Sequence, residues 1–411
     1  MPQQNATPED TTAEPLPLME RVGVDLLRRA SLRQRERLFG DDEIHTLNED
    51  EQRELLRIER RTVYRAAVVG AVTGFVGAVA EIAVGPELDL FDSALSGWIF
   101  LGVGVGIASL LELSYLYILA LQAVDDLAFA AGIDLRQESE SGQHLIRALA
   151  RAALEVPNPV TPVFGVDPRR EASRLWLLAA TLIYKAKVGI TNFVLKAAVR
   201  RLLARAGLRF AAAYVAIPVL AIWDAVVLFM VLREARLRVI GPSAVVAFVT
   251  LIVDHRGPSP SVPARQALLG AVASCIMVQS DMHPNLQTML EVLYQRYDDV
   301  NEDSIADRTD RFLADLRALG PDDQRMVLEL LTATSILTGR LRRKGRTLLL
   351  RAYTACDRPL DLDAVKTLTT HFVRGKAVTR DLLDQLTPDT NTPSDRPALT
   401  SPAGKGKLSP M

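Results

Sequence analysis

Three long apolar runs, separated by charged segments, dominate the middle of the chain. They extend from Ala66 to Gly85, from Ser93 to Ala123 and from Phe210 to Leu232, and a shorter run extends from Ala244 to Val253. About 20 mainly apolar residues are needed to cross the roughly 30 Å of hydrocarbon in a bilayer. Each of the three longer runs therefore approaches the length of a membrane-spanning helix.

The remaining sequence has a helical character. Apolar and polar residues rarely alternate with the period of two that marks a half-buried strand, and Ala, Leu, Arg and Glu are abundant. Thr46 and Glu49 have the spacing of a capping box, which marks the start of a helix. The pattern predicts an all-α protein, with a hydrophobic membrane-associated helical region that includes a glycine-rich helical hairpin, followed by a small soluble helical bundle.

Charge and hydropathy divide the chain into six segments. The two ends are polar and contain proline but no long apolar run, so we expect them to be disordered. A segment rich in Pro and Gly near residue 257 predicts a linker. The six predicted segments are a disordered tail at 1–17, charged amphipathic helices at 18–62, a hydrophobic helical region at 63–253, a linker at 254–263, a small helical domain at 264–386 and a second disordered tail at 387–411.

Glycines are frequent in the first two apolar runs. They are Gly70, Gly74 and Gly77 in the first run and Gly102, Gly104 and Gly106 in the second. In water each such glycine costs a helix about 1 kcal/mol relative to Ala, whereas in lipid small residues let helices approach closely. Only the acidic segment from Pro86 to Asp92 joins the two runs, which favours a tight hairpin in the bilayer. Two buried helices of a large soluble bundle are the alternative.

Three carboxylates lie inside the apolar runs, namely Glu81, Glu112 and Asp224. Ionisable groups within membrane segments usually face the interior of a helix bundle, and by default they are candidates for a functional site. A path for protons or ions would require several of them on facing helices. These residues therefore define a transporter or pore subunit as one alternative function.

A basic segment precedes the third apolar run. From Asp167 to Arg209 there are ten Lys or Arg residues and two acidic ones. Cations that recur beside apolar residues indicate a helix lying on an anionic lipid surface, and they mark that side as cytoplasmic. The candidate contacts to anionic lipid are Lys196, Arg200, Arg201, Arg205 and Arg209.

Composition excludes several functional classes. The 48 basic and 49 acidic residues give a net charge of -1, so nothing indicates bulk nucleic-acid binding. Cys275 and Cys356 are too few for a disulfide framework, and the apolar helical surroundings of Cys275 predict a core residue. The sequence contains no P-loop, no HExxH and no GxSxG motif. We therefore expect no catalytic residue, no metal site and no cofactor, and a protein that is not an enzyme.

One spacing resembles a calcium-binding loop. Acidic or amide residues occupy positions 1, 3, 5, 9 and 12 of an EF-hand-like segment between Asp299 and Asp310. Ser304 stands where the sharp turn of such a loop requires Gly. Helix caps and a solvated loop are the simpler interpretation of this segment.

Three segments in the middle zone carry a resemblance to a known family. They are AAVVGAVTGFVGAVAE (Ala66 to Glu81), LSYLYILALQAVDDLAFAAGIDL (Leu113 to Leu135) and AIPVLAIWDAVVLFMVLREAR (Ala216 to Arg236). In texture and order, residues 60–245 resemble the EcsC family of bacterial membrane-associated proteins. The resemblance implies a helical region that is associated with the bacterial membrane.

The C-terminal zone contains two similar helical segments, from Leu268 to Tyr297 and from Leu328 to Ala355. The turns within them are Ser280-Asp281-Met282 and Thr338-Gly339-Arg340. This zone resembles the TerB-like domain of tellurite-resistance proteins, which implies a small all-helical module. The first turn keeps the family's Asp without its Gly, and the second keeps the Gly without the Asp.

Together these features predict a non-enzymatic bacterial membrane-associated protein, an envelope or stress-related scaffold. We expect membrane lipids as partners, and protein partners that bind the TerB-like domain through its acidic stretch (298–323) and its basic stretch (340–351). The expected location is the bacterial inner membrane with the C-terminal domain in the cytoplasm. The alternatives are the transporter or pore subunit and a soluble helical protein that binds lipid.

Overall fold

The computed structural model describes residues 47–84, 94–133, 140–170 (except 155, 157 and 159–161), 209–254, 259–297 and 309–387, together with Val24. Within these residues the regular structure is helical, and the β-type pairing is limited to one isolated bridge between Val163 and Val166. The prediction of an all-α fold is therefore confirmed. The helices are α2 (Glu49–Val84), α3 (Ala94–Ala130), α4 (Glu140–Ala153), α6 (Arg209–Val253), α7 (Val262–Gln279), α8 (Pro284–Arg296), α9 (Thr309–Ala318), α10 (Pro321–Ile336), α11 (Arg343–Ala355), α12 (Leu362–Val373) and α13 (Arg380–Asp384).

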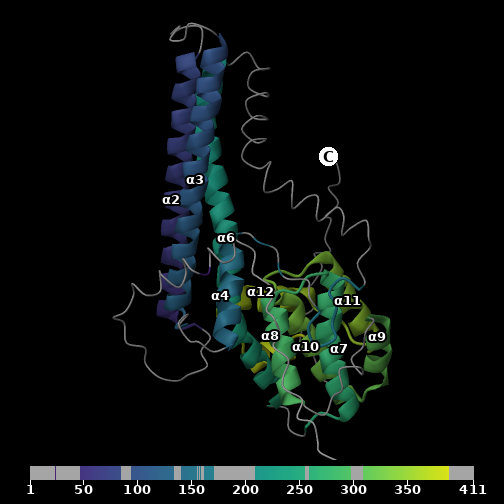
Figure 1. The fold of residues 1–411 in the computed structure, drawn as a ribbon. Helices are drawn as coiled ribbons and strands as arrows, with labels where there is room; N and C mark the ends of the chain where they lie inside the picture. The colour runs from purple at the N-terminus through teal and green to yellow at the C-terminus, as the bar shows by residue number, and fades with distance from the viewer. Residues whose placement is uncertain are drawn as a thin grey trace, which may run out of the picture.

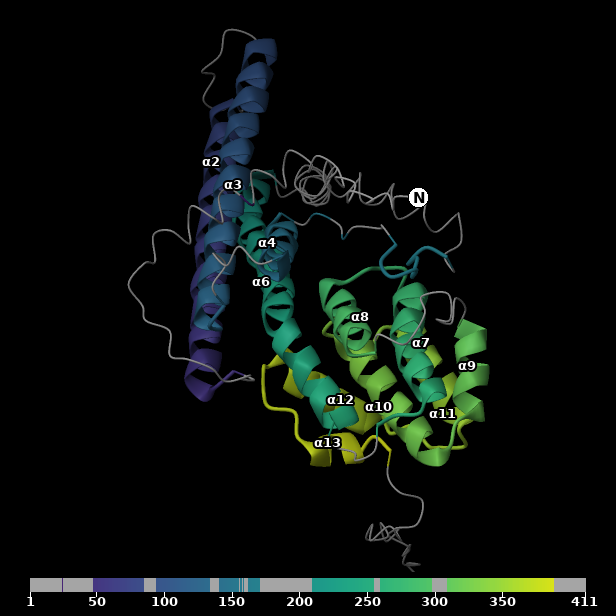
Figure 2. The ribbon, with the colours of Figure 1, turned by 60° about the horizontal axis from the view of Figure 1, so that its bottom comes forward.

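The helices form two parts of different shape (Figure 1). A narrow bundle of α2, α3 and residues 209–232 of α6, here called the spike, rises from one side of the molecule. Helices α7 to α13 and residues 233–253 of α6 form a compact C-terminal unit, and α4 packs on α6 where the two parts meet. Figure 2 shows the same division from a second direction.

Helix α6 belongs to both parts. It runs without a break from Arg209 to Val253 and contains Pro218 and Pro242. Its second half packs against α8 and α10, where Phe248 and Ile252 are fully buried. The run from Ala244 to Val253 is thus apolar because it fills the core of the C-terminal unit. The predicted linker at 254–263 begins directly after α6, and its last two residues are the first two of α7.

Three helices in the described part of the chain are long and apolar enough to cross a membrane, namely α2, α3 and α7. The most apolar window of α7 is 67% buried inside the protein, against 22% for α2 and 17% for α3. The apolar side chains of α7 therefore already have a protein environment. Cys275 on this helix is buried, which confirms its predicted core position, and burial raises the pKa of its thiol to about 12.

The start of α2 is fixed by a capping box. The Asn48 backbone N–H donates to Glu51 Oε2 (2.9 Å), and the Glu51 N–H donates to Asn48 Oδ1 (2.8 Å). The prediction of Thr46 and Glu49 for this box was therefore wrong by two residues. Asn at the cap satisfies the same free backbone N–H groups as Thr, and Glu49 becomes the first helical residue.

Helices α2 and α6 approach closely along a stripe of small residues. Thr62, Ala66, Gly70, Gly74 and Ala78 follow each other at four-residue spacing on α2 and are buried. A Cβ atom on Gly70 would lie 2.6 Å from the Leu220 carbonyl oxygen and 2.6 Å from Asp224 Oδ2, both on α6. The predicted role of glycine in close helix packing is confirmed at Gly70. By contrast, Gly77, Gly102, Gly104 and Gly106 have no such neighbour within 4 Å.

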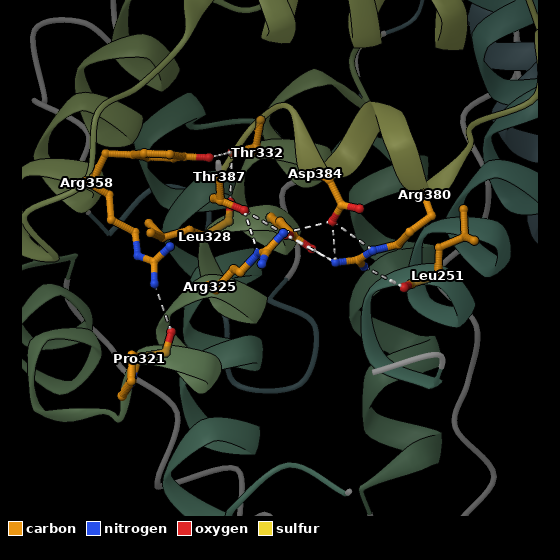
Figure 3. Close-up of polar contacts among 11 residues, drawn as sticks. Leu251, Pro321, Arg325, Leu328, Thr332, Arg358, Arg380, Asp384 and Thr387 are labelled. Carbon is orange, nitrogen blue, oxygen red and sulfur yellow. Dashed lines mark hydrogen bonds and ion pairs between the residues drawn. The ribbon is translucent and has the colours of Figure 1, made fainter. Parts of the chain in front are cut away.

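A buried carboxylate anchors the C-terminal segment to α10 and α6 (Figure 3). Glu329 is fully buried, and it accepts from Thr387 Oγ1 (2.8 Å) and pairs with Arg325 (3.2 Å) and Arg380 (3.3 Å). Arg380 also donates to the Leu251 carbonyl oxygen (3.0 Å) in the last turn of α6, which has no partner of its own within the helix. This network is structural, because it joins α13, α10 and the end of α6.

We expect Gly70→Ala to destabilise the spike. The added methyl group meets the α6 backbone, and such overpacking costs about 1–3 kcal/mol, which outweighs a gain in helix propensity of up to about 1 kcal/mol. Urea unfolding of the full chain in detergent micelles, followed by circular dichroism, measures the loss. Gly104→Ala is the matched control, because nothing lies within 4 Å of its new methyl group. Equal stability of the two variants would contradict close packing at Gly70.

Candidate membrane-contacting site

The outer surface of the spike is apolar along its length. On α2 the exposed side chains include Val68, Val72 and Phe75, and on α3 they include Ile99 and Val103. The further exposed apolar residues of this surface are Val76, Val79, Ile107, Leu110, Leu111, Tyr214, Ile222, Val226, Phe229 and Met230. Helices in water bury their apolar face and expose polar residues. The spike departs from this arrangement, because large apolar side chains cover its outer surface, while its interior holds the small residues of α2 and two carboxylates beside buried leucines of α3 and α6.

The length of this apolar surface matches one bilayer. At about 1.5 Å per residue, the section of α2 from Ala66 to Val84 is about 28 Å long, close to the roughly 30 Å of hydrocarbon. Tyr64, at the base of this section, is 71% exposed, and Tyr115 on α3 is also exposed. Tyrosine is enriched at membrane–water interfaces, since its ring suits the hydrocarbon and its hydroxyl the headgroups.

Two of the three predicted intramembrane carboxylates point into the spike. Glu112 is 3% exposed and Asp224 is 2% exposed. The Asp224 carboxylate lies against the backbone of α2 at Gly70, because no Cβ atom there keeps it away. Glu81 belongs to α2, but its side chain lies outside the described residues. The burial of Glu112 and Asp224 fits the tendency of such groups to face a bundle interior.

Most of the predicted lipid-contacting cations lie outside the described residues. These are Lys196, Arg200, Arg201 and Arg205. Arg209 begins α6, at the end of that helix remote from the C-terminal unit, so a spike that crosses the membrane does not place both of them on the predicted cytoplasmic side. Their contact with anionic lipid stays a prediction.

At the base of the spike a buried ion pair joins α2 to α6. Arg236 lies 3.2 Å from Glu59 Oε1, and the two side chains are 12% and 7% exposed. Since Gly70 lies against Leu220 and Glu59 against Arg236, α2 and α6 run antiparallel. Charged side chains at this level mark the point where the apolar surface ends.

Two residues before Arg236, Glu234 forms a polar cluster that joins α6 to the C-terminal unit. Its Oε1 accepts from Arg238 Nη2 (3.0 Å) and lies 3.1 Å from His283 Nε2. His283 Nδ1 accepts the Asn285 backbone N–H (3.2 Å), so Nε2 carries the proton and donates to Glu234. Arg238 also donates to Asn158 Oδ1 (3.1 Å). Burial alone raises the pKa of Glu234. The hydrogen bond from His283 and the charge of Arg238 lower it by more than burial raises it, so the pKa falls to about 2.

Asn285 bridges the two parts through backbone groups. It is 1% exposed, and its Nδ2 donates to the carbonyl oxygens of Leu237 (2.9 Å) and Leu337 (3.0 Å). A Cβ on Gly241 would lie 2.0 Å from Asn285 Oδ1, so α6 admits this side chain only because position 241 is glycine. Asn285 could not be recognised from the sequence, because its two partners lie 48 and 52 residues away in the chain.

The two predicted C-terminal turns lie near each other at this joint. Asp281 accepts from Asn158 Nδ2 (2.9 Å) and lies 3.6 Å from Arg342 Nη2. Gly339 has a φ of 75°, and its carbonyl oxygen accepts from Arg233 on α6 (3.1 Å). Asp281 of the first turn and Gly339 of the second turn thus both make contacts at the junction between α6 and the C-terminal unit.

A shallow groove of about 690 Å³ lies between α9 and α11 on the C-terminal unit. Its apolar lining includes Leu313, Ala314 and Leu350, and Arg317 and Arg351 also line it. Among the described residues no group of three His, Cys, Asp or Glu side chains is arranged to hold a metal ion. The EF-hand-like segment falls mostly outside those residues, and Asp310 within them pairs with Arg351 (2.7 Å).

Comparison with models of protein families, with curated proteins and with solved structures found no match to this chain. The resemblances to the EcsC family and to TerB-like domains therefore stay predictions from the sequence. The spike supplies the independent indication of membrane association, through two long apolar helices whose outer side chains have no protein environment.

We expect Glu234→Gln to weaken the joint in a pH-dependent way. The folded carboxyl has a pKa of about 2, below its ordinary value of 4.5, so its charge stabilises the fold fully above pH 4.5 and this contribution is lost as the pH falls to about 2. The variant should be about 1–3 kcal/mol less stable at pH 7, and the difference should shrink below pH 4.5. Denaturant unfolding across this pH range measures it.

Glu54→Gln is the control for this measurement. Glu54 is half-exposed and pairs with the exposed Arg57 on α2, and exposed pairs contribute at most about 1 kcal/mol. If the free energy of unfolding of Glu234→Gln differs from that of the wild type by the same amount at every pH, the stabilising role of the charged carboxylate is contradicted.

Proposed function

We propose that this chain is a non-enzymatic, membrane-anchored scaffold of a bacterial envelope or stress system. The observation that carries the proposal is the outer surface of the spike, on which large apolar side chains of α2, α3 and α6 are exposed along about the thickness of a bilayer. Such a surface exceeds the scattered apolar residues that a soluble protein normally exposes. Lipid is the solvent that suits it.

The C-terminal unit is the part available for recognising protein partners. Its buried apolar side chains continue into those at the base of the spike, and the joint at Glu234 and Asn285 holds it there. In this proposal the spike crosses the bacterial inner membrane and the C-terminal unit stands in the cytoplasm at the membrane surface. The groove between α9 and α11, with Arg317 on its lining, suits an acidic amphipathic segment of a partner.

We expect the full chain to stay in the pellet when a membrane fraction is extracted with alkaline carbonate. Phe75→Lys combined with Val103→Lys should release it, because each Lys near the middle of a membrane helix costs about 2.5–3.5 kcal/mol on insertion. Phe75 and Val103 are both more than half exposed on the spike. The measured quantity is the fraction of the chain in the pellet.

Val262→Lys combined with Leu350→Lys is the matched control, since both side chains are exposed apolar residues of the C-terminal unit. We expect this control to remain in the pellet. A wild-type chain that washes into the supernatant, and is monodisperse in buffer without detergent, would overturn the anchor and favour a soluble lipid-binding protein.

A second candidate function, a transporter or pore subunit, is favoured by the buried carboxylates of Glu112 and Asp224. Ion flux into proteoliposomes tests it against the scaffold. For a scaffold we expect no flux above that of protein-free vesicles. Flux that Glu112→Gln or Asp224→Asn abolishes, with insertion unchanged, would instead establish the pore.

A further inference from the structure

We propose that two groups of arginine and lysine side chains at the level of the spike base, one on α2 and one on the C-terminal unit, bind the anionic headgroups of the membrane. This inference rests on the proposed insertion of the spike and assigns a second, electrostatic contact to different residues. The two groups, here called the cationic collar, consist of Arg60, Arg61 and Arg65 on α2, and Arg340, Arg343, Lys344 and Arg346 at the start of α11.

On α2 the collar continues the apolar surface of the spike. Arg61, Arg65, Val68, Val72 and Phe75 follow at spacings of three or four residues, and all five side chains are exposed. Residues at this spacing lie on one face of a helix. The same outward face therefore changes from cationic to apolar between Arg65 and Val68, as expected where a helix passes from headgroups into hydrocarbon.

On the C-terminal unit the collar lies at the same height. Glu59 of α2 pairs with Arg236 of α6, and Arg233, one turn nearer the spike, donates to the Gly339 carbonyl oxygen. The turn that begins with Gly339 is thus level with Arg60 on α2. Both lie where the apolar part of α6 ends, after Leu232.

The start of α11 faces the spike side of the C-terminal unit. Helix α10 runs antiparallel to α6, since Arg380 joins Glu329 to Leu251 while Asn285 joins Leu337 to Leu237. The end of α10 therefore points toward the spike. Helix α11 follows after a short turn and starts at that same end, and α10 and α11 pack together (Figure 2).

The collar cations have no partner within the described protein. No described acidic side chain forms an ion pair with any of the seven, whereas Arg342 beside them pairs with Asp281. Four of them also lie at or before the N-terminal turn of α11, where the helix dipole disfavours positive charge. Protein stability thus does not account for their placement, and anions at this position would be favoured by both the cations and the dipole.

The position of the collar at the base of the spike favours the membrane as the source of these anions. Insertion would hold the collar at the headgroup layer, where each Lys or Arg contributes about 1 kcal/mol of attraction to anionic lipid. A nucleic acid or an acidic protein would need to approach the same narrow zone at the membrane surface. We therefore assign the collar to anionic lipid headgroups.

Amine labelling of Lys344 tests the proposal in the intact protein. The full chain is placed in nanodiscs of phosphatidylcholine, or of equal parts phosphatidylcholine and phosphatidylglycerol, and labelled with a water-soluble amine reagent that is read by mass spectrometry. We expect phosphatidylglycerol to slow the labelling of Lys344 several-fold in low salt, and high salt to abolish this protection. Lys366, which is exposed on α12, is the internal control and should label equally in both discs.

Arg343→Glu combined with Arg346→Glu provides the second measurement. We expect its partition from micelles into anionic vesicles to fall by at least about tenfold, with unchanged partition into neutral vesicles. A melting temperature equal to or above that of the wild type shows that the fold is intact, since the substitutions favour the helix dipole.

The outcomes separate the collar from the anchor. A chain that enters neither vesicle refutes the spike as an anchor. A chain that enters both equally, with Lys344 labelled at the same rate in both discs, refutes the collar alone. Equal protection of Lys344 by an RNA oligonucleotide or by an acidic peptide in neutral discs would also refute the assignment to lipid.

Discussion

The close approach of α2 and α6 determines the rest of the structure. Small residues on α2, with Gly70 at the tightest point, let the backbones of the two helices meet. Because small residues occupy the inner face of α2, the large apolar side chains of this helix are turned outward. Packing inside the spike and the need for a lipid environment outside it therefore have one cause.

The junction between the two parts depends on polar groups at the end of the apolar surface. Glu59 and Arg236 join the spike helices, and Glu234 and Asn285 join α6 to the turns of the C-terminal unit. Glu59 and Asn285 are buried, and Glu234 is partly exposed. Since α6 is continuous through this junction, one helix connects the spike directly to the C-terminal unit.

The sequence predicted much of the fold. The long apolar runs with their glycines became the spike, and the packing role of Gly70 could be expected from its spacing to Gly74. Cys275 could be placed in a core because apolar residues surround it on a helix. The capping box was misplaced by two residues because Thr46 and Asn48 are both good caps, each followed three residues later by Glu, and only the position of the helix start separates them.

The candidate site was less predictable. Glu112 and Asp224 can be recognised in the sequence as charges within apolar runs. Glu234, His283 and Asn285 look like ordinary polar residues there. Their role depends on segments 48 or more residues apart in the chain, and such pairings carry no local pattern. The collar could not be predicted from the sequence either. Arg61 and Arg343 come to the same level only because α2 pairs with α6 and α6 pairs with α10.

The sequence by itself determined that the protein is helical and that it carries three apolar runs of nearly membrane-spanning length, because both follow from composition and local spacing. The tertiary structure decided how the apolar runs are used. It gave the end of α6 and all of α7 to the core of the C-terminal unit, and it left α2 and α3 with an apolar outer surface. The physical reason is that hydropathy measures the need for an apolar environment, while only packing decides whether protein or lipid provides it.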